Sequence, residues 1–273
     1  MRRDRWNALL RGYVRAHLSP DEGERQFVSK VYASVCNVIG AANSLQIGSY
    51  PRFTAISPLH DLDVLFVLGE WNPQLHDPAQ ALADLQARMD AQYVNPTNHD
   101  FRVERQTHSV TLRFFNGADE VFGVDVVPAY IDGSNSDGDD MYVVPEVAVR
   151  PHFERHRLNE AVTRGDQEMA WIRTDPRGYI TAATRLNQAN DDFRKAVKFA
   201  KGWRHHRKTE DEGFALKSFH LEQIITEWVA EHPNSDIFDM LFEFFRRLPD
   251  FMRYPKSQTG LTPTETLMSM CEV

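Results

Sequence analysis

The chain has 273 residues, of which 42% are hydrophobic and 26% are charged, as expected for a globular protein with one large or two small domains. A formal net charge of −8 argues against a broad basic surface, so we expect no general nucleic-acid binding. The two cysteines, Cys36 and Cys271, are too few for a disulfide framework or a zinc cluster. The first residues lack the apolar core of a signal peptide, and no run approaches the roughly 20 apolar residues that span a bilayer. We therefore expect a cytoplasmic protein without a membrane partner.

The first half of the chain predicts a mixture of helices and strands. Apolar spacing predicts helices over 4–18 and 20–38, the second with Ser19 as its N-cap and Pro20 at its first position. Runs of branched and aromatic residues predict strands, and a third helix is expected over 78–92. The predicted strands are 45–47, 61–68, 101–105, 110–115 and 122–127.

The character of the chain changes after a polar, acidic loop over 133–140. From about residue 155 the apolar spacing is helical throughout. The predicted helices are 156–164, 178–206, 213–232 and 235–248. We therefore predict the α+β class, with a mixed-sheet lobe over residues 1–150 and an α-helical lobe over residues 151–273.

Three aspartates are the strongest candidates for a catalytic centre. Asp61 and Asp63 are two residues apart on one predicted strand, so both side chains point to the same face. Two carboxylates this close repel each other, and a divalent cation such as magnesium removes the conflict. Asp125 stands alone in an apolar strand, where a carboxylate costs free energy unless it is paired or bound to metal. Three such carboxylates can hold two metal ions.

Each of these features also has an ordinary structural interpretation. A pair of aspartates on a surface strand is common, and Asp125 by itself could be a hydrogen-bonded carboxylate of the core. The loop that follows strand 45–47 adds weight to the catalytic hypothesis. There, Gly48 lets a phosphate approach the backbone, and Ser49, Arg52 and Thr54 can donate hydrogen bonds to it. The alternative for this loop is a plain turn, because its residue types favour turns.

The combination of Gly48-Ser49 with Asp61-x-Asp63 and Asp125 resembles the polymerase-β-like nucleotidyltransferases. Within that superfamily the chain is most similar to the bacterial cyclic-oligonucleotide synthases of anti-phage (CBASS) signalling, relatives of cyclic GMP-AMP synthase and oligoadenylate synthetase. The most specific stretches are 48–56, 61–68 and 125–130, and the resemblance extends over about residues 20–230.

This resemblance implies a polymerase-β-like lobe with a mixed sheet, and a helical lobe that closes the nucleotide cleft. It implies two Mg²⁺ ions, or Mn²⁺, at the aspartates, and ATP or other nucleoside triphosphates as substrates. The expected products are cyclic or short linear oligonucleotides that act as second messengers, formed with release of pyrophosphate and sensed by a downstream effector. We expect the enzyme to be a monomer.

The resemblance also selects residues in the helical half. Lys201 resembles the lysine that reaches the triphosphate, and Ser218 resembles a serine that contacts phosphate. Lys198 shares a helix face with Lys201, but a solvated basic face is the slightly better explanation for Lys198. Tyr130 is a candidate to stack on a base, since every base offers a π-face, although ordinary packing is the alternative.

The chain departs from the family pattern in two places. Many relatives have a second glycine before the loop threonine, where this chain has Phe53, and the helical pattern of the family does not continue far beyond Phe245. Two alternatives therefore stay open. One is a toxin-like nucleotidyltransferase that modifies tRNA or a protein. A tRNA acceptor normally needs a broad basic surface, and the net charge of −8 argues mildly against that acceptor. The other is a non-catalytic regulator that binds nucleotides.

Overall fold

The computed structural model describes residues 2–147, 168–211, 213–214 and 216–253. The chain forms two compact units, each built from separate stretches of sequence. The first, here called the helical unit, comprises Met1–Asp21, Ser49–Leu59 and Gly178–Val273. The second, the sheet unit, comprises Glu22–Gly48 and His60–Arg177. This division differs from a single boundary at residue 150, because the first helix and the loop after residue 48 pack with the C-terminal helices.

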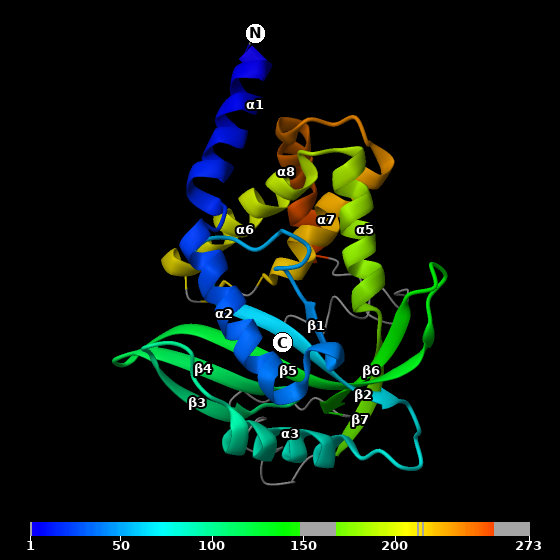
Figure 1. Cartoon of the computed structure of the whole chain (residues 1–273). Helices are drawn as coiled ribbons and strands as arrows, with labels where there is room; N and C mark the ends of the chain where they lie inside the picture. Colours follow the sequence, from blue (N-terminus) through cyan, green and yellow to red (C-terminus); the bar gives the residue numbers. More distant parts are fainter. Residues whose placement is uncertain (1, 148–167, 212, 215, 254–273) are drawn as a thin grey trace. The chain divides into compact units, whose positions relative to one another are not determined.

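Among the described residues, the sheet unit is built on one seven-stranded sheet (Figure 1). Its strands are β1 (Ser44–Ile47), β2 (Asp61–Glu70), β3 (Asp100–Arg105), β4 (Val110–Asn116), β5 (Asp119–Ser134), β6 (Asp140–Val147) and β7 (Met169–Thr174). The spatial order is β1-β2-β5-β4-β3, with β6 paired to β5 and β7 paired to β6. β2 and β5 run parallel, whereas the other pairs are antiparallel. The sheet is therefore mixed, as the sequence predicts.

One face of this sheet is covered by α2 (Glu22–Ile39) and α3 (Pro78–Gln92) (Figure 1). Phe27 of α2 meets Phe122 of β5 edge to face, with ring centroids 5.2 Å apart. Along β5, the buried Val124 and Val126 follow Phe122 at intervals of two and so point to the same side. The residues between them, Asp125 among them, point to the opposite face.

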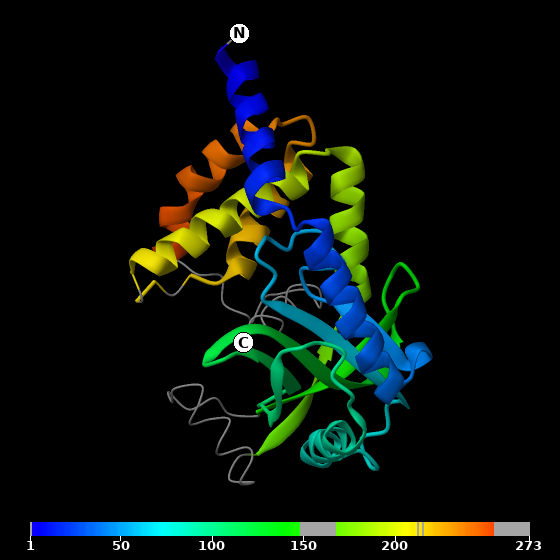
Figure 2. The same cartoon turned by 60° about the vertical axis from the view of Figure 1, so that its left-hand side comes forward.

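The helical unit has its own apolar core. Its helices are α1 (Arg2–Tyr13), the short π-helix η1 (Val14–Leu18), α5 (Pro176–Ala189, whose first two residues belong to the sheet unit), α6 (Phe193–Glu210), α7 (Ser218–Glu231) and α8 (Ile237–Arg253). The helices α6 and α8 lie side by side (Figure 2). Phe193, Leu221 and Phe244 are among the buried residues of this core, and Leu10 of α1 packs against it.

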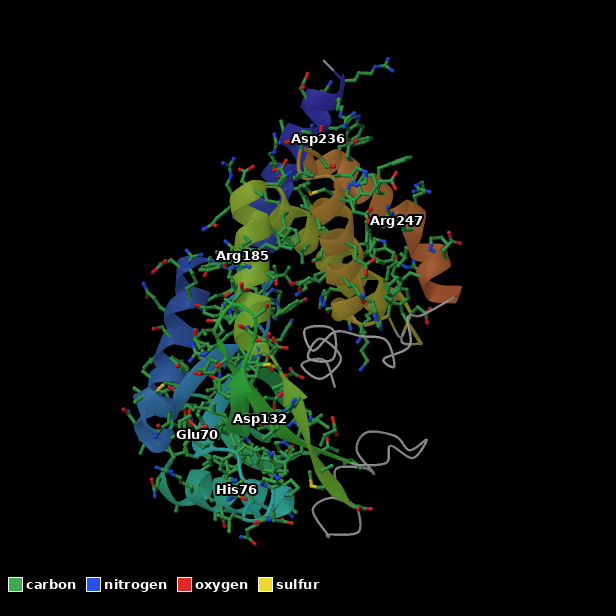
Figure 3. All side chains as sticks on the ribbon, turned by 90° about the vertical axis from the view of Figure 1, so that its right-hand side faces the viewer. Glu70, His76, Asp132, Arg185, Asp236 and Arg247 are labelled. Atoms are coloured by element: carbon green, nitrogen blue, oxygen red, sulfur yellow. The ribbon has the colours of Figure 1, made fainter. Side chains whose placement is uncertain are left out.

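Polar contacts attach α1 to the C-terminal helices of the same unit. Arg11 donates to the buried Asp192 through Nε, at 2.8 Å from Oδ1. Asn7 donates through Nδ2 to Oδ2 of Asp236 at 2.8 Å, and Asp236 lies beside α1 (Figure 3). These contacts explain why the first residues of the chain belong to the helical unit.

Most of the predicted elements are present, and the departures have local causes. The second predicted helix begins at Glu22, so Ser19 is not its N-cap and Asp21 directly precedes the helix. The helix predicted over 178–206 is two helices, because Asn190 turns the chain by accepting the Asp192 and Phe193 amides. β6 and β7 were not predicted. The helix predicted over 156–164 lies outside the described residues.

Among the described residues, no helix combines the length and apolar character needed to cross a bilayer.

Candidate active site

The pairing of β2 with β5 places the three aspartates of the sheet unit on one face. Asp63 is the register partner of Asp125 across the parallel pair, and Asp61 is the partner of Gly123. Since side chains two residues apart on a strand share a face, Asp61 and Asp63 point the same way as Asp125. Asp61 is exposed, whereas Asp63 and Asp125 are half-buried. The sheet thus gathers three residues that are 64 positions apart in sequence at most.

Gly48 lies against one of these carboxylates. The residue before it, Ile47, is the register partner of Asp63 in the antiparallel pair of β1 and β2. Gly48 has φ +72°, and a Cβ atom there would lie 1.9 Å from Oδ2 of Asp63. A glycine is therefore required both for the backbone conformation and for the close approach of the Asp63 side chain.

Asp125 is held by hydroxyl groups of the neighbouring strand and its turn. Thr111, the register partner of Asp125 on β4, donates its hydroxyl to Oδ1 of that carboxylate. Ser109 donates to the same oxygen at 3.3 Å. Behind them, Nε2 of Gln106 donates to Oγ1 of Thr111 at 2.6 Å. All three side chains are buried, so one oxygen of Asp125 has a fixed set of donors.

The donor chemistry of this face fits magnesium, which prefers oxygen ligands and takes one or two carboxylates together with substrate phosphates. Within the described part of the chain, no three His, Cys, Asp or Glu side chains already converge on one metal position. Like charges repel, so carboxylates converge fully only when a cation joins them. The backbone register of β2 and β5 supplies the proximity, and Gly48 leaves room for the Asp63 side chain.

Three of the predicted phosphate-binding residues form a buried cluster in the helical unit around Glu222, which is 1% exposed. Arg52 donates to both carboxylate oxygens, with Nε 3.0 Å from Oε1 and Nη2 3.2 Å from Oε2. Nζ of Lys201 lies 3.1 Å from Oε2 of Glu222 and 3.4 Å from Oγ1 of Thr54. The Arg52 guanidinium also lies over the ring of Tyr179, 4.3 Å from its centroid. We call these residues the Glu222 cluster.

Charge balance inside this cluster decides the ionisation of Glu222. Burial alone would raise the pKa of a carboxyl group. Here the charges of Arg52 and Lys201, with the hydrogen bonds that both donate, outweigh burial and lower the pKa of Glu222 to about 2. Glu222 is therefore ionised at neutral pH, and its negative charge neutralises part of the positive charge of Arg52 and Lys201.

The loop after Gly48 is compact. The carbonyl oxygen of Ser49 accepts the backbone amides of Thr54, at 3.0 Å, and of Ala55, at 3.2 Å. Phe53 has φ +61°, a left-handed conformation that a bulky residue rarely adopts. We expect many relatives to have glycine at this position. Phe53 adopts the backbone conformation that glycine favours. Its exposed ring lies under the Arg194 guanidinium, 4.8 Å away.

The remaining predicted residues lie elsewhere within their units. Ser218 is the first residue of α7, where backbone amides lack partners within the helix. Tyr130 stacks on His76, with centroids 3.7 Å apart and planes 6° from parallel. Because Tyr130 is five residues beyond Asp125 on β5, its ring points to the opposite face, where α3 follows the labelled His76 (Figure 3). The structure therefore does not place Tyr130 beside the three aspartates.

Sequence reasoning did not find Glu222, Gln106, Ser109 or Thr111. Glu222 did have a signal, because it is spaced three and seven residues from the apolar Ile225 and Val229 and so falls on the buried side of its helix. A carboxylate on such a face needs a partner. Thr111 gave no comparable signal, since its contact with Asp125 depends on which strands pair.

Comparison with solved structures finds several proteins with a similar architecture. The structure shares its fold with bacterial proteins named CdnC, CdnG and CdnE, among them a CD-NTase and a cyclic dinucleotide synthase, as the resemblance implied. One similar structure is CdnC of E. coli MS115-1 with ATP, at a TM-score of 0.60 and 19% identity over 90% of this chain and 72% of that one. A second is the CD-NTase CdnG of Bradyrhizobium diazoefficiens with GTP, at a TM-score of 0.61 and 15% identity over 97% and 88%.

A third similar structure is the cyclic dinucleotide synthase CdnE of Elizabethkingia meningoseptica with GTP and Apcpp, at a TM-score of 0.57 and 14% identity over 92% of this chain and 91% of that one. No family model matches the chain, and no curated protein matches it in sequence. Because these three identities are below 20%, the likenesses show the fold alone.

Proposed function

We propose that this protein is a metal-dependent nucleotidyltransferase that joins ribonucleoside triphosphates into cyclic or short linear oligonucleotides, with release of pyrophosphate. The observation that carries this proposal is the β2–β5 register, which sets Asp63 beside Asp125 and Asp61 on the same face. The fold supports it, because the similar structures were solved with ATP, with GTP, and with GTP together with Apcpp, the last of them named a cyclic dinucleotide synthase.

In this proposal Asp61, Asp63 and Asp125 hold the catalytic Mg²⁺ ions, with Mn²⁺ as a substitute. When bound, the ions lower the pKa of the attacking ribose hydroxyl and stabilise the charge of the triphosphate and of the leaving pyrophosphate. The chain supplies the alignment: the strand register fixes the backbone of two ligands, and Gly48 admits the Asp63 side chain. Such alignment before binding is the main protein contribution to phosphoryl transfer.

We propose that Ser49, Lys201 and Ser218 contact the triphosphate. Lys201 is a flexible point charge with three donors, of which two have the partners Glu222 and Thr54. Arg52 is held more firmly than Lys201, by two hydrogen bonds to Glu222 and by its position over the ring of Tyr179, and Thr54 also contacts Glu222. We therefore expect Lys201 to contribute more to nucleotide affinity than Arg52 does.

The product class is proposed by analogy with the similar structures. The similar structures include a cyclic dinucleotide synthase and a synthase described as making c-UMP-AMP. By analogy, the product of this chain would be a second messenger in anti-phage defence, sensed by a separate effector, and made in the cytoplasm by a monomeric enzyme.

The test is incubation of the purified protein with labelled ATP, GTP, CTP and UTP and with Mg²⁺ or Mn²⁺. Products are treated with phosphatase and resolved by chromatography and mass spectrometry. We expect a phosphatase-resistant oligonucleotide that is lost in Asp61→Asn/Asp63→Asn. The matched control is Asp119→Asn, which removes an exposed carboxylate at the start of β5.

Two results would contradict this proposal. If the double variant still forms the product, Asp61 and Asp63 are not required for the reaction. Transfer of label to added tRNA or to protein, without free oligonucleotide, would favour the other acceptor class.

A further inference from the structure

Within the part of the chain that the structure describes, the side-chain hydrogen bonds donated to Asp125 fall on one of its two oxygens. Thr111 and Ser109 both donate to Oδ1, and Gln106 donates to the Thr111 hydroxyl. A hydroxyl has a single proton, so a hydroxyl that accepts from Gln106 and donates to Asp125 has a defined orientation. These contacts form a directed chain from Gln106 through Thr111 to one oxygen of Asp125.

The backbone makes this arrangement rigid. Gln106 and Ser109 are the first and last residues of the turn between β3 and β4. Within this turn, the backbone amide of Gln106 donates to the backbone carbonyl of Ser109 at 2.8 Å. Thr111 follows on β4, directly opposite Asp125. The relative exposures of Gln106, Ser109 and Thr111 are 4%, 0% and 3%, so water does not compete for these bonds. Hydrogen bonds that buried hydroxyl groups donate to a carboxylate are charge-assisted and directional.

We propose that Thr111 is a positioning residue for metal binding, which holds Oδ1 of Asp125 so that Oδ2 is presented to the cation. The inference rests on the proposed function, because it assumes that Asp125 is a metal ligand. Groups that orient a ligand through its second atom commonly change metal affinity by 10–100-fold when they are removed. Ser109 supports the same oxygen through a longer bond and has a smaller share.

The test is the binding of Mn²⁺ alone, measured by electron paramagnetic resonance on the purified full chain. Thr111→Val keeps the shape of the side chain and removes its hydroxyl. We expect about tenfold weaker Mn²⁺ binding in this variant, and recovery to within about twofold of the wild type in Thr111→Ser, which restores the donor. The activity assay should then show a raised half-saturating Mg²⁺ concentration, with kcat largely regained at high Mg²⁺.

The matched control is Thr174→Val. Thr174 is also a buried threonine of the sheet unit, and its hydroxyl has no hydrogen-bond partner among the described residues. This variant should bind Mn²⁺ as the wild type does. Ser109→Ala is the second probe if Thr111→Val does not fold, and we expect a two- to threefold loss from it, below the range for the removal of a principal partner.

The pattern across variants separates the two proposals. Weaker binding in Thr111→Val with recovery in Thr111→Ser supports the positioning role. Wild-type affinity in both Thr111→Val and Ser109→Ala, with loss of binding in Asp125→Asn, overturns it and leaves the metal site intact. Absence of Mn²⁺ binding in the wild type, or full binding in Asp125→Asn, overturns the metal site together with the role of Thr111.

Discussion

Gly48 joins two constraints at one residue, a left-handed backbone and contact with a catalytic candidate. Its φ is +72°, and any Cβ there meets Oδ2 of Asp63 at 1.9 Å. A side chain at this position must therefore move Asp63 or the strand that carries it.

We predict that Gly48→Ala lowers nucleotidyl transfer at least tenfold and destabilises the fold by about 1–3 kcal/mol. Gly117→Ala is the control, because Gly117 has φ +64° in the same unit and has nothing within 4 Å of an added Cβ. It carries the backbone strain without the clash. Equal activity losses in the two variants would show that contact with Asp63 is not the cause.

Phe53 is the reverse case, a bulky residue in a conformation that suits glycine. The left-handed region costs an L-residue roughly 1–2 kcal/mol, and the contact of Phe53 with Arg194 returns about 0.5–1 kcal/mol. Alanine at this position keeps the strain and loses the contact, whereas glycine loses both.

We therefore predict that Phe53→Gly is more stable than Phe53→Ala, by about 1 kcal/mol. At ordinary positions alanine is the more stable of the two residues. Urea unfolding of both variants measures the order, and a more stable alanine variant would contradict the strain argument.

Whether a site residue can be predicted from the sequence depends on how far apart in the sequence its contact partners are. The pair Asp61 and Asp63 is evident from local spacing, and Gly48 from the loop that precedes it. Asp125 is visible because a carboxylate in an apolar strand is exceptional. Thr111 cannot be predicted from local sequence, since its contact with Asp125 depends on the pairing of β4 with β5.

At the scale of elements, α7 holds Glu222 at the point where α6 and the loop after Gly48 supply positive charge. Within the helical unit this one side chain binds Arg52 from the loop and Lys201 from α6. Removing one partner of a buried ion pair leaves an uncompensated charge, which costs more than the pair contributes.

We predict that Glu222→Gln lowers the free energy of unfolding by about 3–5 kcal/mol. Glu231→Gln, a similar change at the exposed end of α7, should change it by less than about 0.5 kcal/mol. Guanidinium titrations of the two variants give the comparison. A loss below about 1 kcal/mol in Glu222→Gln would mean that Arg52 and Lys201 find other partners.

The elements themselves were predicted with uneven success, for physical reasons. Helices α2 and α3 have apolar residues at helical spacing, and strand β2 is a run of branched and aromatic residues, so local sequence predicts all three. β6 begins at Asp140, directly after an acidic segment that favours a loop, and its pairing with β5 and β7 outweighs that local preference. The break at Asn190 depends on one side chain that caps the turn, which helical spacing alone does not register.

At the scale of the whole molecule, two carboxylates make stability depend on pH. The pKa of Glu222 is lowered to about 2, for the reasons given above. For Asp236, burial would raise the pKa, but hydrogen bonds from Arg3, the Asp239 amide and Asn7 lower it to about 2. A carboxyl group whose pKa is lower in the folded state stabilises that state above its unfolded pKa, and this contribution is lost as the pH falls through the folded pKa.

We predict that stability falls between about pH 4.5 and pH 2, as these two carboxylates take up protons. The fully buried Glu222 contributes about 3 kcal/mol to this fall, from a shift of its pKa from 4.5 to about 2. Thermal unfolding midpoints between pH 7 and pH 2 test this, and the profile of Glu222→Gln should be flatter than that of the wild type. Parallel profiles would assign the acid loss to other groups.

The division into two units also has a consequence for how the chain can be cut. The backbone passes from one unit to the other after Asp21, Gly48, Leu59 and Arg177, four times in all. A single proteolytic nick at any of these points leaves three covalent connections between the units. A gene for the sheet unit alone would have to omit residues 49–59 and bridge Gly48 to His60, and a gene for the helical unit would need two such bridges. Recombination with a single crossover point could therefore not exchange the whole aspartate-bearing unit between related genes.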